Sequence, residues 1–415
     1  MNLRISGLIA AFALAGLLGS TQSRAQNAYI TNSSSDNVSV IDTEKNKVTA
    51  TIVGSFVSPY GVAVSPNGRK VYITNSLTSV GNSNVSVIDT EKNKVIATIP
   101  VGSEPGGVAV SPDGSKAFVA NANSATVSVI DTATNTVTAT IPVGAGPYGL
   151  AATPDGSKVY VTITLLNSTG PRGNVSVIDT ATNMVIATIL VGSFPTGVAV
   201  IPDGRKVYIA NQSSANVSVI DTATDTLTAT IPVGSVPTGV AVTPGQLPII
   251  GRRVGQDDDG TRRIKVYVAN VDSNTVSAID TATDKVTATI AVGTSRGPNG
   301  VAVTPDGKKV YVANAFSNNL SVIDTAKNKV TATIRVGLNP NAFGIFIQPA
   351  QPAQRFAGTP GKANCYGKSV SALVRQDHGL NAAAAALGFS SLRELQNAIL
   401  EFCEGDLSTE REPSY

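Results

Sequence analysis

Short apolar runs recur along most of the chain, and each has the length of a β-strand. Between residues 28 and 348, segments such as 127–130 (VSVI) and 137–141 (VTATI) alternate aliphatic residues with Ser or Thr. A period of two residues is typical of strands with one buried face. Turn-forming segments of the types Pro-Asp-Gly and Asp-Thr-x-x-Asn separate the runs. The pattern predicts an all-β fold of short antiparallel strands.

Two sequence markers repeat through this region. The tetrapeptide YITN at residues 29–32 returns in six further copies, beginning at residues 72, 118, 160, 208, 267 and 311. A second marker, Val-Ile-Asp-Thr or a near variant, contains Asp42, Asp89, Asp131, Asp179, Asp221, Asp280 and Asp324. The aspartates lie 42 to 59 residues apart, and each period contains four apolar runs. This is the period of a four-stranded propeller blade with some longer loops.

The two ends of the array are complementary. The first copy begins at its second strand, residues 28–31, and no innermost strand precedes it. The last copy is followed by an extra apolar run at residues 343–347. Joining these ends makes one composite blade, and closure of the ring removes exposed sheet edges. We therefore predict a seven-bladed β-propeller over residues 26–349.

The turn between the last two strands of each blade has its own signature. An Asn or Asp occupies its last position, where a left-handed backbone conformation is expected. The aspartate of the Val-Ile-Asp marker precedes this turn, and we expect its carboxylate to accept backbone N–H groups within the turn. Nearly every acidic residue of the array lies at such a repeated turn, which favours a structural role over a catalytic one.

The repeats resemble the YVTN family of β-propeller repeats, which occurs in exported and surface-layer proteins of prokaryotes. The resemblance covers residues 28 to 348, and the fourth copy departs from it with Ile163 in place of Asn. It implies a seven-bladed propeller and says little about the ligand, because the motif is a property of the scaffold.

The N-terminus has the features of a signal peptide. Arg4 is followed by an apolar stretch from residue 5 to 19, and Ser23 and Ala25 are placed as in a cleavage site. We predict that residues 1–25 are removed and that the protein is exported to the periplasm, the cell surface or the medium. No later segment is apolar for long enough to predict a spanning helix.

The C-terminus departs from the repeat. Residues 350–364 are rich in Pro, Ala and Gln and are predicted to be a linker, and residues 405–415 a tail. Residues 365–404 have helical periodicity and are bracketed by Cys365 and Cys403. Because export permits disulfides and the spacing matches no metal site, we predict that these cysteines staple a small helical module.

Composition limits the chemistry of the propeller. The net charge is +3, and charged residues make up 14% of the 415 residues. The single His and both Cys lie beyond residue 349, and there is no Trp. This excludes His-ligated copper or heme, thiol nucleophiles and a Ser-His-Asp arrangement within the propeller. We therefore predict no cofactor and no catalytic residue.

Positions that break the repeat are the candidates for recognition. The residue after the Pro that opens each innermost strand varies, and this face also carries the ends of the second strands, mostly Asn. For these asparagines, capping of their own blade is favoured over ligand binding, because a repeated residue has a repeated structural role. The candidates on this face are Tyr60, Tyr148, Thr196, Thr238 and Asn299, with Leu165, Leu166 and Arg172 in a long loop.

An insertion on the other face contains Asp257, Asp258 and Asp259. Three carboxylates are weak candidates for Ca²⁺ binding. The insertion lacks the spacing of an EF-hand loop, and Arg252, Arg253, Arg262 and Arg263 flank the acidic run. A solvated hairpin with mixed ion pairs is the favoured interpretation.

These observations predict an exported, non-catalytic binding scaffold that recognises a protein or a polysaccharide of the cell envelope. An alternative is an accessory or catalytic chain of a periplasmic system similar to quinoprotein dehydrogenases or lactonases. A further alternative is binding of single-stranded nucleic acid, for which two tyrosines on a near-neutral face are a weak basis. The sequence leaves the oligomeric state open.

Overall fold

The computed structural model describes residues 26–76, 83–164, 173–244, 264–293, 297–349 and 395–396. The chain divides into two compact units, of which residues 26–351 form one. The predicted signal peptide, the loop residues Leu165, Leu166 and Arg172, the aspartates 257–259, and Cys365 and Cys403 lie outside the described residues. Those predictions are not tested by the structure.

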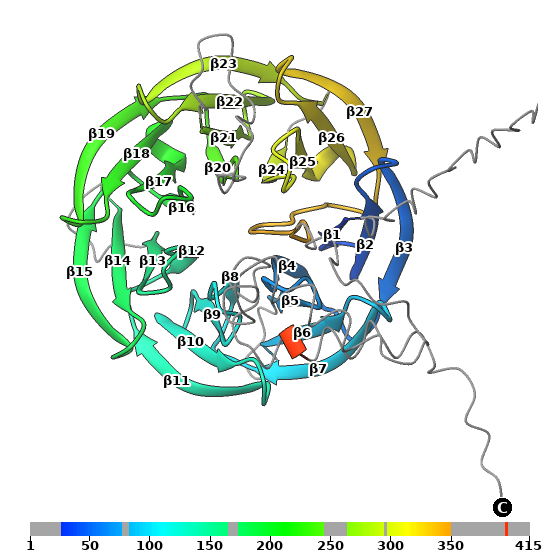
Figure 1. Cartoon of the computed structure of the whole chain (residues 1–415), viewed down its shortest axis with the longest axis vertical. Helices are drawn as coiled ribbons and strands as arrows, with labels where there is room; N and C mark the ends of the chain where they lie inside the picture. Colours follow the sequence, from blue (N-terminus) through cyan, green and yellow to red (C-terminus); the bar gives the residue numbers. More distant parts are fainter. Residues whose placement is uncertain are drawn as a thin grey trace, which may run out of the picture. The chain divides into compact units, whose positions relative to one another are not determined.

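Residues 26–349 fold into seven blades arranged in a ring, as Figure 1 shows. The first three blades contain β1 (Asn27–Asn32), β2 (Asn37–Asp42) and β3 (Lys47–Val53); β4 (Pro59–Val64), β5 (Lys70–Asn75), β6 (Asn84–Asp89) and β7 (Lys94–Pro100); and β8 (Pro105–Val110), β9 (Lys116–Asn121), β10 (Thr126–Asp131) and β11 (Thr136–Pro142).

The other four blades have the same plan. They contain β12 (Pro147–Ala152), β13 (Lys158–Ile163), β14 (Asn174–Asp179) and β15 (Met184–Leu190); β16 (Pro195–Val200), β17 (Lys206–Asn211), β18 (Asn216–Asp221) and β19 (Thr226–Pro232); β20 (Pro237–Val242), β21 (Lys265–Asn270), β22 (Thr275–Asp280) and β23 (Lys285–Ala291); and β24 (Pro298–Val303), β25 (Lys309–Asn314), β26 (Asn319–Asp324) and β27 (Lys329–Arg335). Two short 3-10 turns, η1 (Gln212–Ser214) and η2 (Ala315–Ser317), follow β17 and β25.

Every blade is an antiparallel meander that runs outward from the central channel. In blade 4, β12 pairs with β13, β13 with β14, and β14 with β15. A bulge lies at the same place in the outer pair of every blade, for example between Val177 and Ile178 in blade 4. The predicted seven-bladed, all-β fold is confirmed.

The composite first blade closes the ring. Strand β1 lacks an innermost partner of its own, and residues 340–348 take that place. The Tyr29 N–H donates to the Phe346 carbonyl at 2.8 Å, and the Gln348 N–H donates to the Asn27 carbonyl at 2.9 Å. The same segment also bonds to the second blade, because the Val62 N–H donates to the Phe343 carbonyl at 3.0 Å. The C-terminal end of the propeller thus joins blades 1 and 2.

Adjacent blades meet most closely around the channel, at a glycine near the middle of each innermost strand. A Cβ atom added at Gly197 would overlap the carbonyl oxygen of Thr238 in the next blade. The same overlap with a neighbouring carbonyl arises at Gly61, Gly149, Gly239 and Gly300. We call these glycines the inner rim. The innermost strands can approach this closely because these positions carry no side chain.

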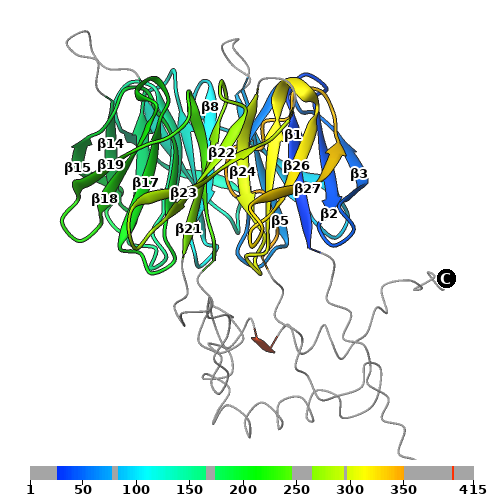
Figure 2. The same cartoon turned by 90° about the horizontal axis from the view of Figure 1, so that it is seen from above.

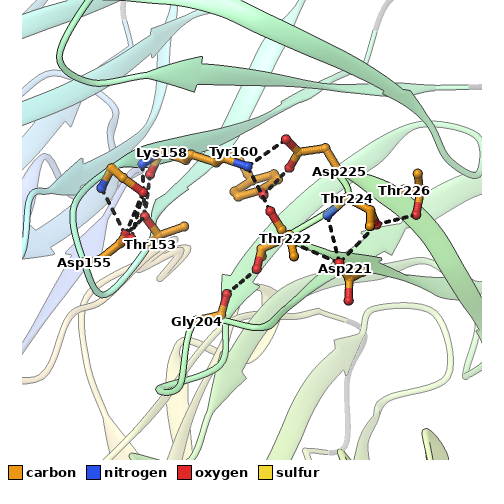
Figure 3. A network of polar contacts seen from close by, with 12 residues as sticks. Thr153, Asp155, Lys158, Tyr160, Gly204, Asp221, Thr222, Thr224, Asp225 and Thr226 are labelled. Carbon is orange, nitrogen blue, oxygen red and sulfur yellow. Dashed lines mark hydrogen bonds and ion pairs between the residues drawn. The ribbon is translucent and has the colours of Figure 1, made fainter.

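Farther from the channel, adjacent blades are joined through side chains. The Tyr160 hydroxyl donates to the Asp225 carboxylate of the next blade at 2.6 Å, and Lys158 Nζ lies 2.7 Å from the same carboxylate (Figure 3). We call this contact between a second-strand aromatic residue and the turn of the next blade an interblade latch. The other hydrogen-bonded latches join Tyr208 to Asp284, Tyr311 to Asn46 and Tyr29 to Asn93.

The turns have the predicted conformation and bonding. The latch residues adopt a left-handed backbone, with a φ of 52° at Asp225 and 51° at Asn46. In the same turn as Asp225, the Asp221 carboxylate accepts the N–H groups of Ala223 and Thr224, at 3.0 and 2.9 Å. Those hydrogen bonds favour the ionised carboxylate, and they lower the pKa of Asp221. These aspartates have structural roles, as the sequence predicts.

Candidate functional site at the channel mouth

Three aromatic side chains from distant parts of the chain meet at one mouth of the central channel. Tyr60 and Tyr148 follow the prolines that open β4 and β12, and Phe343 belongs to the closing segment. The Tyr60 ring stacks on Phe343 with a centroid distance of 5.7 Å. Tyr148 packs edge-on against both rings, at 5.8 Å from Tyr60 and 5.3 Å from Phe343. We call this group the mouth cluster.

The two phenols of the mouth cluster are hydrogen-bonded to each other. Burial raises the pKa of Tyr60, and the hydrogen bonds of its hydroxyl to Tyr148 and Asn299 partly offset that rise. Burial also raises the pKa of Tyr148, and the neighbouring Tyr60 raises it further. Both phenols are therefore neutral at physiological pH, and each is suited to donate a hydrogen bond rather than to act as an anionic ligand.

Thr196 and Thr238 lie in the next two blades, and both side chains are buried. The Thr196 hydroxyl lies 3.4 Å from the Pro237 carbonyl, and the Thr238 hydroxyl donates to the Asn299 carbonyl at 3.2 Å. The second strands of these two blades carry Ala210 and Ala269 in place of the threonine found in blades 1, 2 and 4.

In blade 4, that second-strand threonine, Thr162, donates to the carbonyl of Thr196 in the next blade at 2.9 Å. Thr196 and Thr238 supply the equivalent contact from the innermost strand. Their bonds account for them structurally, and their candidate role in binding stays a prediction.

Asn299 and the second-strand asparagines lie on the same side of the propeller. The Asn299 amide donates to Asn341 Oδ1 at 2.7 Å, so it links β24 to the closing segment. The asparagines at the ends of the second strands are fully buried, and each bonds within its own blade, as when Asn32 Nδ2 donates to Ser39 Oγ at 2.9 Å. These asparagines thus brace their own blades and do not form an exposed polar ring.

The channel beneath the mouth cluster is narrow. Its cavity has a volume of about 30 Å³, which is close to the share of one water molecule in the liquid. It is lined by glycines and by aliphatic residues that include Val108, Leu150 and Val301. Phe343 of the closing segment also lines it.

The described loops on the mouth side carry Asp36, Glu104 and Asp272 and no Lys or Arg. These loops lie along the upper edge of the ring in Figure 2. Among the described residues, no group of three His, Cys, Asp or Glu side chains is placed to hold a metal ion. No described helix is long and apolar enough to cross a membrane.

Comparison with known proteins assigns a family. The model of the cytochrome D1 heme domain matches residues 25–335, which span the propeller almost completely. The chain belongs to this family. The seven-bladed propeller implied by the YVTN resemblance is confirmed by the structure, and the finer assignment to YVTN repeats stays a prediction. The comparison with curated protein sequences finds no significant match.

Solved structures with a similar fold include two redox proteins. Hydrazine synthase from Kuenenia stuttgartiensis is 25% identical with a TM-score of 0.60, and the match covers 72% of this chain and 92% of that one. Dihydro-heme d1 dehydrogenase NirN, in complex with DHE, is 17% identical with a TM-score of 0.53, covering 75% of this chain and 64% of that one.

A third similar structure is a functionally unknown protein from Desulfotomaculum acetoxidans DSM 771. It is 15% identical with a TM-score of 0.57, and the match covers 77% of this chain and 99% of that one. At this identity, the second and third likenesses show the fold alone.

The prediction of a non-catalytic scaffold for an envelope protein or polysaccharide is wrong. The family match overturns it, because the family is defined by a heme domain. The error arose because the repeats make nearly every polar side chain structural, and we extended that conclusion from the scaffold to the whole protein. The alternative of an accessory or catalytic chain in a periplasmic system similar to quinoprotein dehydrogenases or lactonases agrees better with the family.

The residues of this propeller do not fit a heme held within it. Residues 26–349 contain no His and no Cys, and their one Met, Met184, lies exposed on an outer strand. The mouth phenols are oxygen donors beside Phe343, which lines the channel, and their raised pKa values oppose ligation as phenolates. The described mouth loops also carry no Lys or Arg that could pair with the carboxylates of a tetrapyrrole. We therefore derive no chemical step through a heme in this propeller.

Proposed function

We propose that this chain is the propeller component of an exported, heme-dependent redox enzyme in which another polypeptide supplies the iron ligands. The family match carries the proposal. Residues 26–349 contain no His or Cys, and their one Met is exposed on an outer strand, so we infer that the iron ligands come from outside the propeller. The likeness to a chain of hydrazine synthase, of which this chain covers 92%, supports a role within a redox system. Export and the finer relation to YVTN repeats belong to this proposal.

A heme titration of the chain alone tests the first half of the proposal. The purified full-length chain is titrated with hemin, and the Soret band is followed by absorption. We expect no stoichiometric binding, because residues 26–349 contain no His or Cys and their one Met lies exposed on an outer strand. Stoichiometric binding that Tyr60→Phe or Tyr148→Phe abolishes would overturn the proposal in favour of ligation by the mouth phenols.

Isolation of the native assembly tests the second half. The tagged chain is purified from the organism that encodes it, and heme is quantified by reduced-minus-oxidised difference spectra. We expect a Soret band that copurifies in fixed ratio with a second polypeptide containing His or Met ligands. A colourless preparation that contains the chain alone, from cells that express the intact system, would contradict the proposal.

A further inference from the structure

The turn between β4 and β5 contains the dipeptide Asn67-Gly68, whereas the same turn of other blades contains Asp-Gly. The equivalent residues in blades 3, 4, 5 and 7 are Asp113, Asp155, Asp203 and Asp306. In all of these turns the glycine has a positive φ, which is 69° at Gly68. Asn67 is exposed to solvent. Blade 2 therefore has an amide in a turn where the repeat has a carboxylate.

The Asn67 side chain makes the same contacts as those aspartates. Its Oδ1 accepts a hydrogen bond from the Ser65 hydroxyl at 2.8 Å and another from the Arg69 N–H at 3.1 Å. In blade 4, Asp155 Oδ1 accepts the equivalent bonds from a threonine hydroxyl at 2.5 Å and from a backbone N–H at 3.0 Å. Those bonds favour the ionised carboxylate and lower the pKa of Asp155. The turn of blade 2 is thus suited to an aspartate.

We propose that Asn67 is a site of spontaneous deamidation, and that the aspartate formed there completes the turn as in the other blades. The nitrogen of Gly68 attacks Asn67 Cγ and forms an N–Cγ bond. The Cγ–Nδ2 bond breaks, and ammonia leaves with the proton of the attacking nitrogen. Water then opens the resulting succinimide ring. Addition of water at Cγ gives aspartate, whereas addition at the main-chain carbonyl carbon gives isoaspartate.

The turn both favours and slows this reaction. Gly68 has no side chain to hinder attack by its nitrogen. The two donors at Asn67 Oδ1 polarise the side-chain carbonyl and stabilise the negative charge that forms on this oxygen during the attack. The Gly68 N–H donates to the Ser65 carbonyl at 2.8 Å, and it must leave that bond before it reacts. Exposed turns open locally at a low cost in free energy, so the folded protein reacts slowly rather than not at all.

The chain has one other Asn-Gly dipeptide, which provides an internal control. Asn299 lies in β24, and its Nδ2 donates to Asn341 Oδ1 at 2.7 Å. A Cβ atom added at Gly300 would overlap the carbonyl oxygens of Asn341 and Ala342. The backbone at Gly300 therefore has no room for the rotation that ring closure requires. We expect Asn299 to remain unmodified in the folded protein.

Peptide mapping of the full-length chain, after incubation at mildly alkaline pH, tests the proposal. Trypsin releases residues 48–69 and residues 297–308, and each peptide contains a single Asn and no Gln, so mass spectrometry assigns the deamidated residue directly. We expect deamidation to be at least about tenfold faster at Asn67 than at Asn299. In guanidinium chloride both residues should react at similar rates, because the fold no longer distinguishes the two dipeptides.

An Asn67 that stays intact in the folded chain overturns the proposal, as does an Asn299 that reacts equally fast there. Chromatography against synthetic peptides separates aspartate from isoaspartate, and isoaspartate as the sole product also overturns it. The variant Asn67→Asp reproduces the aspartate product. Its midpoint of unfolding in urea should be at or above that of the wild type, and a lower midpoint would mean that the turn does not accommodate the carboxylate.

Discussion

The inner rim and the interblade latches both join one blade to the next, but they do so by different means. At the inner rim, a glycine faces a backbone carbonyl, and the approach is too close for any Cβ atom. At the latches of four blades, a tyrosine hydroxyl donates to an Asn or Asp of the next blade; in two others the tyrosine is buried without that bond, and one blade has Phe118 instead. The sequence varies where side chains make the contact and is constant where the backbone makes it. The following predictions test that contrast.

Alkaline pH should disrupt all the tyrosine latches together. Burial raises the pKa of Tyr72 and of Tyr267 to about 12, whereas an unfolded tyrosine ionises near pH 10. A raised folded-state pKa means that the stabilisation is complete below pH 10 and is lost as the pH rises toward 12. For these two residues the loss is on the order of a few kcal/mol in total, a substantial part of the stability of a typical domain.

Absorbance at 295 nm and far-ultraviolet circular dichroism, recorded from pH 9 to 12.5, check this prediction. The ionisation of the latch tyrosines should coincide with unfolding. If these tyrosines ionised near pH 10 in a protein that remained folded, the latches would not be buried contacts. The inner rim has no group that titrates, so an alkaline transition does not originate there. The buried mouth phenols Tyr60 and Tyr148 also have raised pKa values, so Tyr60→Phe and Tyr148→Phe variants separate their contribution from that of the latches.

Gly197→Ala should break the inner rim at one interface. The added methyl group would overlap the Thr238 carbonyl, and relief requires the movement of two innermost strands. We expect a loss of about 3 kcal/mol in the free energy of unfolding, measured by urea denaturation. Gly106→Ala is the matched control, since that position carries Tyr, Thr or Asn in other blades. Equal losses in the two variants would show that close backbone approach is not what joins the blades here.

Most of the ring could be predicted from the sequence because its determinants are local and repeated. The left-handed turn residues, the carboxylates that accept N–H bonds and the composite first blade follow from strand period and turn chemistry. Each of these signals recurs seven times or lies at an end of the array. The repeats average out accidental patterns, so even the irregular insertion before Ile264 does not obscure the blade it interrupts.

The mouth cluster could be predicted only in part. Tyr60 and Tyr148 stand out because they break the repeat, and the structure brings them together although they are 88 residues apart. The role of Phe343 depends on closure of the ring, which places residue 343 against Gly61. Thr196 is buried beside Ala210 of the neighbouring strand, whose carbonyl its hydroxyl contacts at 3.4 Å, and no single motif records this pairing of two elements. Function was missed for a similar reason, because family membership is spread over the whole array.

Asp225→Ala should weaken one latch by an intermediate amount. It leaves Lys158 and Tyr160 without the carboxylate that both contact, and the two side chains of the ion pair are 23% and 16% exposed. We expect a loss of about 2 kcal/mol. Asp225→Asn should cost less than about 1 kcal/mol, because Asn46 accepts the equivalent bond from Tyr311 at 2.5 Å. Urea denaturation of both variants checks the ranking, and an Asn variant as unstable as the Ala variant would show that the charge, not the acceptor, is essential.

Phe118→Tyr should have the smallest effect and the opposite sign. The repeat places Phe118 opposite Asn183, and Asn183 Oδ1 is a buried acceptor without a hydrogen-bond partner among the described residues. A hydroxyl at residue 118 would supply that partner, as Tyr29 does for Asn93. The gain should reach at most about 1 kcal/mol, the net value of one hydrogen bond, and differential scanning calorimetry should show a small rise in Tm. Tyr29→Phe is the reciprocal variant and should lower Tm by a similar amount. If Phe118→Tyr were destabilising, the interface between blades 3 and 4 would be packed for an apolar ring. The latches would then tolerate exchange of Asn and Asp but not exchange of the aromatic residue.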